Sequence, residues 1–176
     1  LSPAQLDRLI RKIKCSFDLK DCLEFTVEAG RPDSITREKL VALKKNGISR
    51  ISVNPQTMKQ QTLDIIGRHH TVDDTINSFK LARELGFDNI NMDLIMGLPE
   101  ETIDDVRHTM ELVKELAPDN VTIHSLAVKR AARLTIFKDR YSDMQMVNTQ
   151  EHMDLCAAYC KQMGLEPYYL YRQKGM

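Results

Sequence analysis

Asp93 lies in the middle of NINMDLIMGLP, residues 89–99, a stretch that otherwise has the pattern of a β-strand running into a turn. A carboxylate buried without partners is strongly destabilising, because nothing replaces the water it loses. Either this strand is not buried on both faces, or a polar group meets Asp93. Other side chains that could bind a polar ligand stand in similar stretches, at Glu28, Gln56 and His124.

These residues fall in, or within two residues of, four stretches where polar and apolar side chains alternate. At a period of two, each stretch has one apolar and one polar face, and Glu28, Asn54, Asp93 and His124 are predicted to share the polar one. Parallel strands are normally apolar on both faces. The polar faces are therefore expected to line the inside of a curved, incomplete barrel that holds a polar ligand. The alternative is a surface that faces solvent. The stretches are residues 24–28, 50–54, 90–95 and 121–125.

Helical patterns alternate with these strands, with short connections between them. Thr71 with Asp74, and Thr102 with Asp105, have the spacing of capping boxes. Strand and helix in alternation predict an α/β fold with a parallel sheet, whose helices cover one face. From about residue 137 the alternation ends, and residues 166–174 resemble a strand. The predicted helices span residues 3–14, 36–47, 59–66, 71–86, 102–116 and 147–164.

The predicted site has the chemistry of a binding site for a small polar molecule. In βα folds, ligands lie at the carboxyl ends of the strands, and Glu28, Gln56 and Asp93 are at or near those ends. Two carboxylates and an amide suit a ligand with hydroxyl groups and an amine. Arg68, just after a short helix, could bind a ligand carboxylate through its guanidinium fork. The alternative for Arg68 is an ordinary surface residue.

Composition restricts the class of partner. The 176 residues include 25 basic and 25 acidic side chains, so the formal net charge is zero and nothing indicates a nucleic-acid or membrane partner. No apolar run approaches the roughly 20 residues that cross a bilayer, and no signal peptide opens the chain, so a cytoplasmic protein is expected. The chain begins at Leu1 rather than at a methionine. We therefore expect a fragment of a longer protein.

No metal site is predicted from the cysteines or histidines. The cysteines, at positions 15, 22, 156 and 160, have neither a zinc nor an iron–sulfur spacing. Free thiols in a reducing compartment are expected. His69 and His70 are adjacent, so they cannot reach one metal ion from one helix face. The sequence MGLPEET lacks the spacing of a phosphate-binding loop.

Four strings taken together carry a family resemblance: FTVEA, RISVNPQTM, IIGRHHT and NINMDLIMGLPEET. They resemble the radical S-adenosylmethionine enzymes of the oxygen-independent coproporphyrinogen III oxidase group, over about residues 1–127. The resemblance implies four βα units of an incomplete parallel (βα)6 barrel, TIM-like, over residues 1–136. Residues 137–176 would begin an accessory region. The strings SLAVKRAARL and PYYLYRQK are more similar to the branch called coproporphyrinogen dehydrogenase, the second anaerobic form of Gram-positive bacteria.

The resemblance also implies roles for four residues in binding S-adenosylmethionine. Glu28 would contact its amino group, and Gln56 and Asp93 its ribose hydroxyls. Arg68, twelve residues after Gln56, would hold its carboxylate. The alternation of the strands singles out three of these positions independently. Pro55 departs from the family, which has an apolar residue there in many members, and could alter the approach of Gln56.

The three cluster cysteines of the family, C-x-x-x-C-x-x-C, and its Gly-Gly-Thr-Pro stretch are absent from this sequence. We expect a truncated chain that lacks the first two barrel strands and is inactive alone. The resemblance implies that the full-length oxidoreductase uses a reduced [4Fe–4S] cluster and an electron donor to cleave S-adenosylmethionine. The resulting radical would abstract hydrogen from a propionate, leading to decarboxylation of the tetrapyrrole coproporphyrinogen III to protoporphyrinogen IX in haem biosynthesis.

Two other functions stay open. One is a haem-carrying chaperone, since relatives in this family bind haem instead of oxidising its precursor. The other is an α/β ligand-binding domain without radical chemistry. No catalytic residue is assigned from the sequence. Arg172 and Lys174 could meet propionates, or could simply be solvated.

Overall fold

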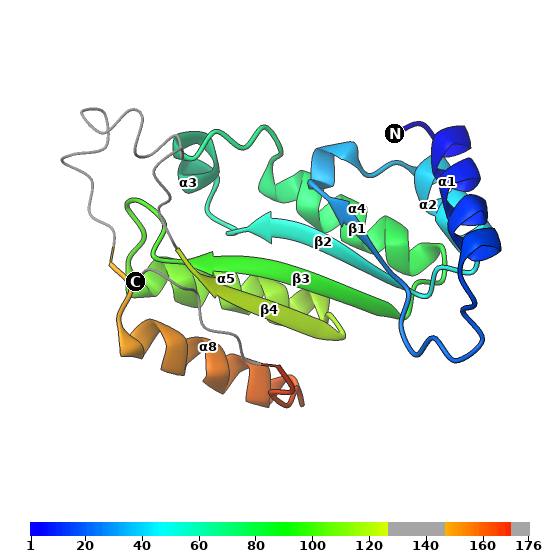
Figure 1. Ribbon diagram of the computed structural model, residues 1–176. Helices are drawn as coiled ribbons and strands as arrows, with labels where there is room; N and C mark the ends of the chain where they lie inside the picture. The colour runs from blue at the N-terminus through cyan, green and yellow to red at the C-terminus, as the bar shows by residue number, and fades with distance from the viewer. Residues whose placement is uncertain (127–146, 170–176) are drawn as a thin grey trace. The chain divides into compact units, whose positions relative to one another are not determined.

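The computed structural model describes residues 1–126 and 147–169 (Figure 1). Its strands form one parallel sheet in the order β1-β2-β3-β4, as the sequence predicts. Helices alternate with the strands, which confirms the α/β class. In chain order the elements are α1 (Pro3–Ser16), β1 (Thr26–Gly30), the 3-10 turn η1 (Pro32–Ser34), α2 (Arg37–Lys45), β2 (Arg50–Gln56), α3 (Gln60–Ile65), α4 (Val72–Glu84), β3 (Asn89–Met96), α5 (Ile103–Leu116), β4 (Asn120–Ser125) and α8 (Gln150–Gln162).

Helix starts are set by local capping. The Thr71 hydroxyl accepts from the Asp74 N–H at 3.0 Å while the Asp74 carboxylate accepts from the Thr71 N–H at 2.8 Å. Thr102 and Asp105 repeat this exchange at the start of α5. Each cap contributes about 1 kcal/mol. Both capping boxes are confirmed, and they fix where the chain leaves the preceding loops.

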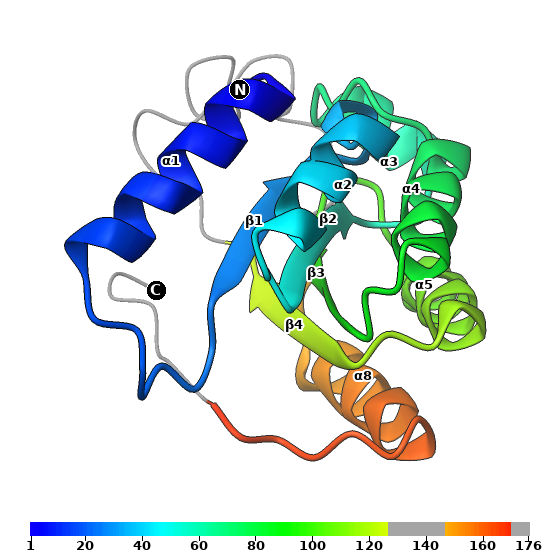
Figure 2. The same cartoon turned by 90° about the vertical axis from the view of Figure 1, so that its right-hand side faces the viewer.

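The chain divides into two compact units, of which the first comprises Leu1–Pro55, His70–Met92 and Pro118–Asn120. Within it, α1 packs on α2, and α4 runs along one side of β2 (Figures 1 and 2). Its core is made by apolar residues of two helices and of β2, namely Leu40, Leu43, Ile51, Val53, Phe79 and Ala82. The apolar face predicted for β2 is therefore buried against α2 and α4.

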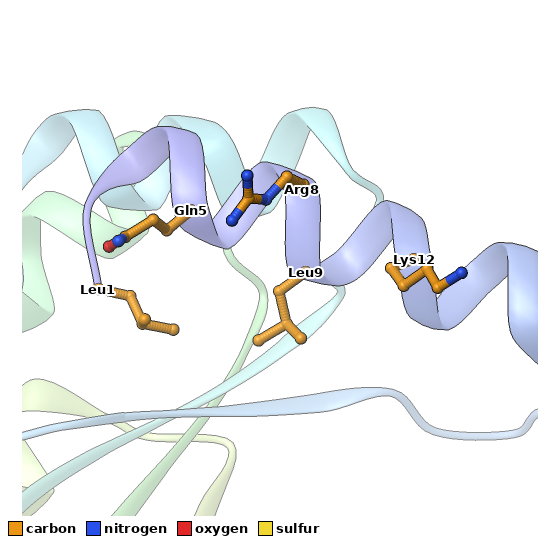
Figure 3. A pocket seen from close by; sticks show the side chains of 5 residues that line it. All are labelled: Leu1, Gln5, Arg8, Leu9 and Lys12. Atoms are coloured by element: carbon orange, nitrogen blue, oxygen red, sulfur yellow. The ribbon is translucent and has the colours of Figure 1, made fainter.

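One side of α1 carries apolar residues that are not part of this core. Leu1 and Leu9 remain 69% and 47% exposed, whereas Ile10 is buried. Figure 3 shows Leu1 and Leu9 pointing to the same side of the helix. With Gln5, Arg8 and Lys12 they line a cavity of about 440 Å³.

The second unit comprises Gln56–His69, Asp93–Ala117 and Val121–Met176. Helices α5 and α8 lie side by side in it (Figures 1 and 2). Their contact is closed by a hydrogen bond from the Tyr159 hydroxyl to the Glu111 carboxylate at 3.2 Å. The buried apolar residues of this unit are Met58, Leu63, Leu94, Met96, Leu98, Val106, Met110, Val113, Cys156 and Tyr159.

Some predicted boundaries shift. The first strand begins at Thr26 instead of residue 24, and the Glu24 carboxylate pairs with Arg50 at 2.8 Å. No strand forms over residues 166–169. Arg172, Lys174 and the predicted domain boundary between residues 136 and 137 lie outside the described residues.

Candidate functional site

A chain of side-chain hydrogen bonds crosses β3, β2 and β1 on the face that the alternation predicts to be polar. The Asn91 amide donates to the Ser52 hydroxyl at 2.9 Å, and that hydroxyl donates to the Asn54 carbonyl oxygen at 2.7 Å. The Asn54 amide in turn donates to Glu28 Oε2 at 3.1 Å. The four residues, Asn91, Ser52, Asn54 and Glu28, all belong to the first unit. They confirm a shared polar face on these three strands.

Burial changes along this polar chain. Ser52 and Asn91 are only 1% and 4% exposed, Asn54 is half-buried, and Glu28 is exposed. The sequence suggested a face that is wet throughout, whereas at β2 and β3 the polar groups satisfy one another away from water. Buried polar groups without such partners would each cost about 1–3 kcal/mol. The polar chain therefore leads from a satisfied interior to a carboxylate that solutes can reach.

Glu28 is the acceptor at the end of this polar chain. It is the third residue of the five in β1 and pairs with Ser52 in the parallel register, before a shift that precedes Gly30. Asn54 holds one carboxylate oxygen, and a carboxylate has about four lone-pair sites in all. Glu28 also lines a cavity of about 210 Å³, together with Leu6, Val27 and Leu40. Its carboxylate can thus accept further hydrogen bonds from a ligand.

Gln56 ends β2 in an unusual conformation. Its φ is 73°, in the left-handed region that residues other than glycine rarely adopt, and its side chain is only 7% exposed. Such a conformation costs about 1–3 kcal/mol and is typical of binding sites. Nothing in the sequence signals it, because residues other than glycine rarely adopt this conformation. The predicted effect of Pro55 on Gln56 stays a prediction.

Three more predicted residues lie in the second unit with Gln56. Arg68 is half-buried and follows Gly67, which ends α3 at a φ of 73°. Asp93 is half-buried and alternates with the fully buried Met92 and Leu94, so it faces away from the apolar core. His124 is half-buried on β4. The carboxylate of Asp93 is therefore tolerated in the middle of β3, since only one face of this strand is apolar.

The cysteines do not form a metal site. Cys15 and Cys22 are exposed, whereas burial raises the pKa of Cys156 to about 12 and also raises the pKa of Cys160. Both thiols of α8 therefore stay protonated near neutral pH, and metals bind the thiolate. Within residues 1–126 and 147–169, no group of three His, Cys, Asp or Glu side chains could hold a metal ion. The residues present do not fit an iron–sulfur cluster.

The turn that follows β3 contains a tightly packed glycine and, four residues later, a buried acid. Gly97 has a φ of 85°, and a Cβ placed on it would lie 2.9 Å from the Asn148 Cβ. Glu101, four residues later, is only 5% exposed and accepts a hydrogen bond from the Thr57 hydroxyl at 2.5 Å. No role is predicted for Glu101 from the sequence, because an acid near a helix start is usually a solvated residue.

Comparison with known proteins agrees with the fold. The family model described as the Radical SAM superfamily matches residues 3–113. The chain is 45% identical to the oxygen-independent coproporphyrinogen-III oxidase-like protein HemZ of Bacillus subtilis, over 100% of this chain and 35% of that protein. It is also 45% identical to the heme chaperone HemW of Bacillus subtilis, over 58% of this chain and 27% of that protein.

Among solved structures, the coproporphyrinogen III oxidase HemN of Escherichia coli, a radical SAM enzyme, is similar with a TM-score of 0.78. The identity is 26%, and the match covers 93% of this chain and 38% of that one. This chain thus spans about a third of the length of HemZ and HemN. In the part of the chain that the structure describes, the helices are too short or too polar to cross a membrane.

Proposed function

The chain belongs to the radical SAM superfamily, and from this we propose that it binds S-adenosylmethionine as part of a cytoplasmic enzyme of haem biosynthesis. The reaction is the anaerobic oxidative decarboxylation of coproporphyrinogen III to protoporphyrinogen IX. Similarity to HemZ over the whole chain and to the fold of HemN supports this assignment. The observation that carries it is the carboxylate of Glu28, anchored by Asn54 at 3.1 Å and open to a ligand.

Each proposed contact follows from the chemistry of its side chain. Glu28 accepts hydrogen bonds from the ammonium group of S-adenosylmethionine, and Arg68 donates to its carboxylate. Asp93 and Gln56 bind its ribose hydroxyls as acceptors. A bond of this kind to a charged group contributes about 1.5–3 kcal/mol. The strained backbone of Gln56 and the outward face of Asp93 are compatible with these roles.

The radical chemistry is supplied by S-adenosylmethionine together with a reduced [4Fe–4S] cluster. The described residues do not fit that cluster, so the part of this chain is to bind and orient S-adenosylmethionine. The tetrapyrrole substrate and the electron donor belong to the same proposal for the full-length protein.

A heme chaperone is the second candidate, because 58% of the chain is 45% identical to HemW. Haem titration of the full-length protein, followed by visible absorption, separates the two functions when it is set beside anaerobic turnover of coproporphyrinogen III. Turnover without stoichiometric haem binding supports the oxidase. Tight haem binding without turnover supports the chaperone.

Glu28→Gln in the full-length protein tests the cofactor role. Affinity for S-adenosylmethionine should fall about tenfold, which corresponds to about 1.4 kcal/mol, while the melting temperature holds. Glu24→Gln is the matched control, since Glu24 is a second exposed glutamate two residues before β1 and pairs with Arg50. Calorimetric titration should show no change for the control. Equal loss in both variants would mean that charge alone, and not the position of Glu28, matters.

A further inference from the structure

Glu101 is a buried carboxyl group that the proposed function does not use. Its partner Thr57 is 1% exposed and lies directly after Gln56 in the chain. The Thr57 hydroxyl also lies 3.4 Å from the Thr109 hydroxyl, which accepts the N–H of Met58 at 3.2 Å. Thr57 and Met58, the first two residues after Gln56, are therefore held by side chains that lie between the end of β3 and the middle of α5. All these residues belong to the second unit.

This arrangement is costly, which makes a purely structural role a poor explanation. Burial raises the pKa of Glu101, and only the hydrogen bond from Thr57 and weaker effects oppose that shift. A hydrophobic residue of similar size would fill the same space without the desolvation cost. Buried titratable groups of this kind are concentrated at functional sites.

The location of Thr57 suggests what Glu101 does. Gln56 is in the left-handed region, with a φ of 73°, and a strained residue persists only where its surroundings over-determine it. The two contacts, Thr57 to Glu101 and Met58 to Thr109, fix the backbone immediately after the strained residue. Without these two contacts, Gln56 can relax toward an extended conformation, and its side chain then points in a different direction.

We propose that Glu101 is a positioning residue that acts through Thr57 to hold Gln56 in its left-handed conformation for binding the ribose of S-adenosylmethionine. The inference rests on the proposed function, in which Gln56 is a ribose ligand. It extends the binding site from the strand ends to the turn after β3. The Glu101 carboxylate itself does not touch the cofactor.

A double-mutant cycle in the full-length protein tests this role, with S-adenosylmethionine titrated by calorimetry. Glu101→Ala and Gln56→Ala should each weaken binding about tenfold. The double variant should bind no more weakly than Gln56→Ala, because Glu101 acts only through Gln56. Glu101→Gln keeps an acceptor oxygen for Thr57, so its affinity should return to within about twofold of the parent.

Lys59→Met is the matched control. Like Thr57 and Met58, Lys59 bonds to residues between the end of β3 and the middle of α5. It forms an ion pair with Asp105 at 2.9 Å and donates a hydrogen bond to the Glu100 carbonyl at 2.7 Å. Unlike them, it lies three residues after Gln56. Its replacement should leave the affinity unchanged. If Glu101→Ala does not fold, Thr57→Val removes the same hydrogen bond at nearly constant volume and should show the same tenfold loss and the same coupling.

The outcomes distinguish a failure of the positioning role of Glu101 from a failure of the proposed function. Additive losses in the double variant would overturn the positioning role, as would a lowered melting temperature at unchanged affinity in Glu101→Ala. In either case a loss in Gln56→Ala would leave the proposed function intact. If Gln56→Ala binds as the parent does, the ribose role of Gln56 fails and the positioning role fails with it.

Discussion

Ser52 both accepts and donates a hydrogen bond in the polar chain through a single hydroxyl. It accepts from Asn91 and donates to Asn54, at 2.9 and 2.7 Å, and it is almost completely buried. A hydroxyl is the smallest group that can do both. The anchoring of Glu28 by Asn54 therefore depends on a buried residue.

Ser52→Ala should lower the free energy of unfolding by about 1–3 kcal/mol, because the buried Asn91 amide loses its acceptor. Asn120→Ala is a suitable comparison, since the Asn120 amide donates to Asn89 at 3.0 Å but is only half-buried, so water can replace the bond. Urea unfolding of both variants gives the two values. A loss in Ser52→Ala no greater than in Asn120→Ala would contradict the importance of the buried bond.

Asp93→Asn should weaken S-adenosylmethionine binding by about one to two decades, at about 1.4 kcal/mol per decade. The amide keeps the shape of the carboxylate but loses its charge and places a donor against the ribose donors. Stability without ligand should hold, because Asp93 faces away from the apolar core. Asp93→Leu should likewise fold. Unchanged affinity with a large fall in melting temperature would make Asp93 a structural residue.

At the scale of elements, the conformation of the turn between β3 and α5 is restricted both by its own backbone and by the segment that packs against it. Gly97 has a φ of 85°, and the segment before α8 places Asn148 directly against it. A side chain at position 97 would meet strain and a steric clash together. The close approach of these two segments thus requires glycine at this position.

Gly97→Ala should therefore destabilise the protein by more than the approximately 1–2 kcal/mol that a left-handed alanine costs alone. Gly164→Ala is the matched control, with a φ of 74° and no atom within 4 Å of the added Cβ. The difference between the two measured by urea unfolding is the steric part. It should shrink when Asn148→Gly is added to Gly97→Ala. Equal losses in the two single variants would exclude the clash.

An element or a site residue can be predicted from the sequence when the forces that determine it act over a short range. The caps at Thr71 and Thr102 were predictable because their hydrogen bonds span three residues, and the outward face of Asp93 because strand alternation is a backbone property. The left-handed Gln56 was not predictable, since the residues that follow it, Thr57 and Met58, make their contacts with residues more than 40 positions away. Glu101 was missed for the same reason.

At the scale of the whole molecule, carboxyl groups with opposite pKa shifts make opposite contributions to stability. Hydrogen bonds from Thr71 lower the pKa of Asp74, so its contribution is present above the ordinary value of 3.8 and is lost as the pH falls. Burial raises the pKa of Glu101. Its contribution is complete below the ordinary value of 4.5 and is lost as the pH rises through the raised pKa.

Glu101→Gln removes the pH-dependent contribution of Glu101 to stability and keeps that of Asp74. The stability of the parent relative to this variant should therefore decline as the pH rises above about 4.5, and should be constant below it. Urea unfolding at a series of pH values on both proteins measures this difference. A difference that grows with pH would mean that the folded protein favours the charged form of Glu101.

The hydrogen bonds from Asn91 to Glu28 all run in one direction. Every donor along the row faces the carboxylate, so the row has a donor end inside the protein and an acceptor end at its surface. Successive bonds of the same polarity reinforce one another. Because Ser52 has a single proton, its commitment to Asn54 obliges Asn91 to be the donor at the other side. The ionised Glu28 carboxylate has no proton to donate, so Asn54 must turn its amide toward Glu28 and its carbonyl oxygen toward Ser52. The direction of a buried row of hydrogen bonds is thus decided at its exposed end, and a surface carboxylate orients an amide two strands away.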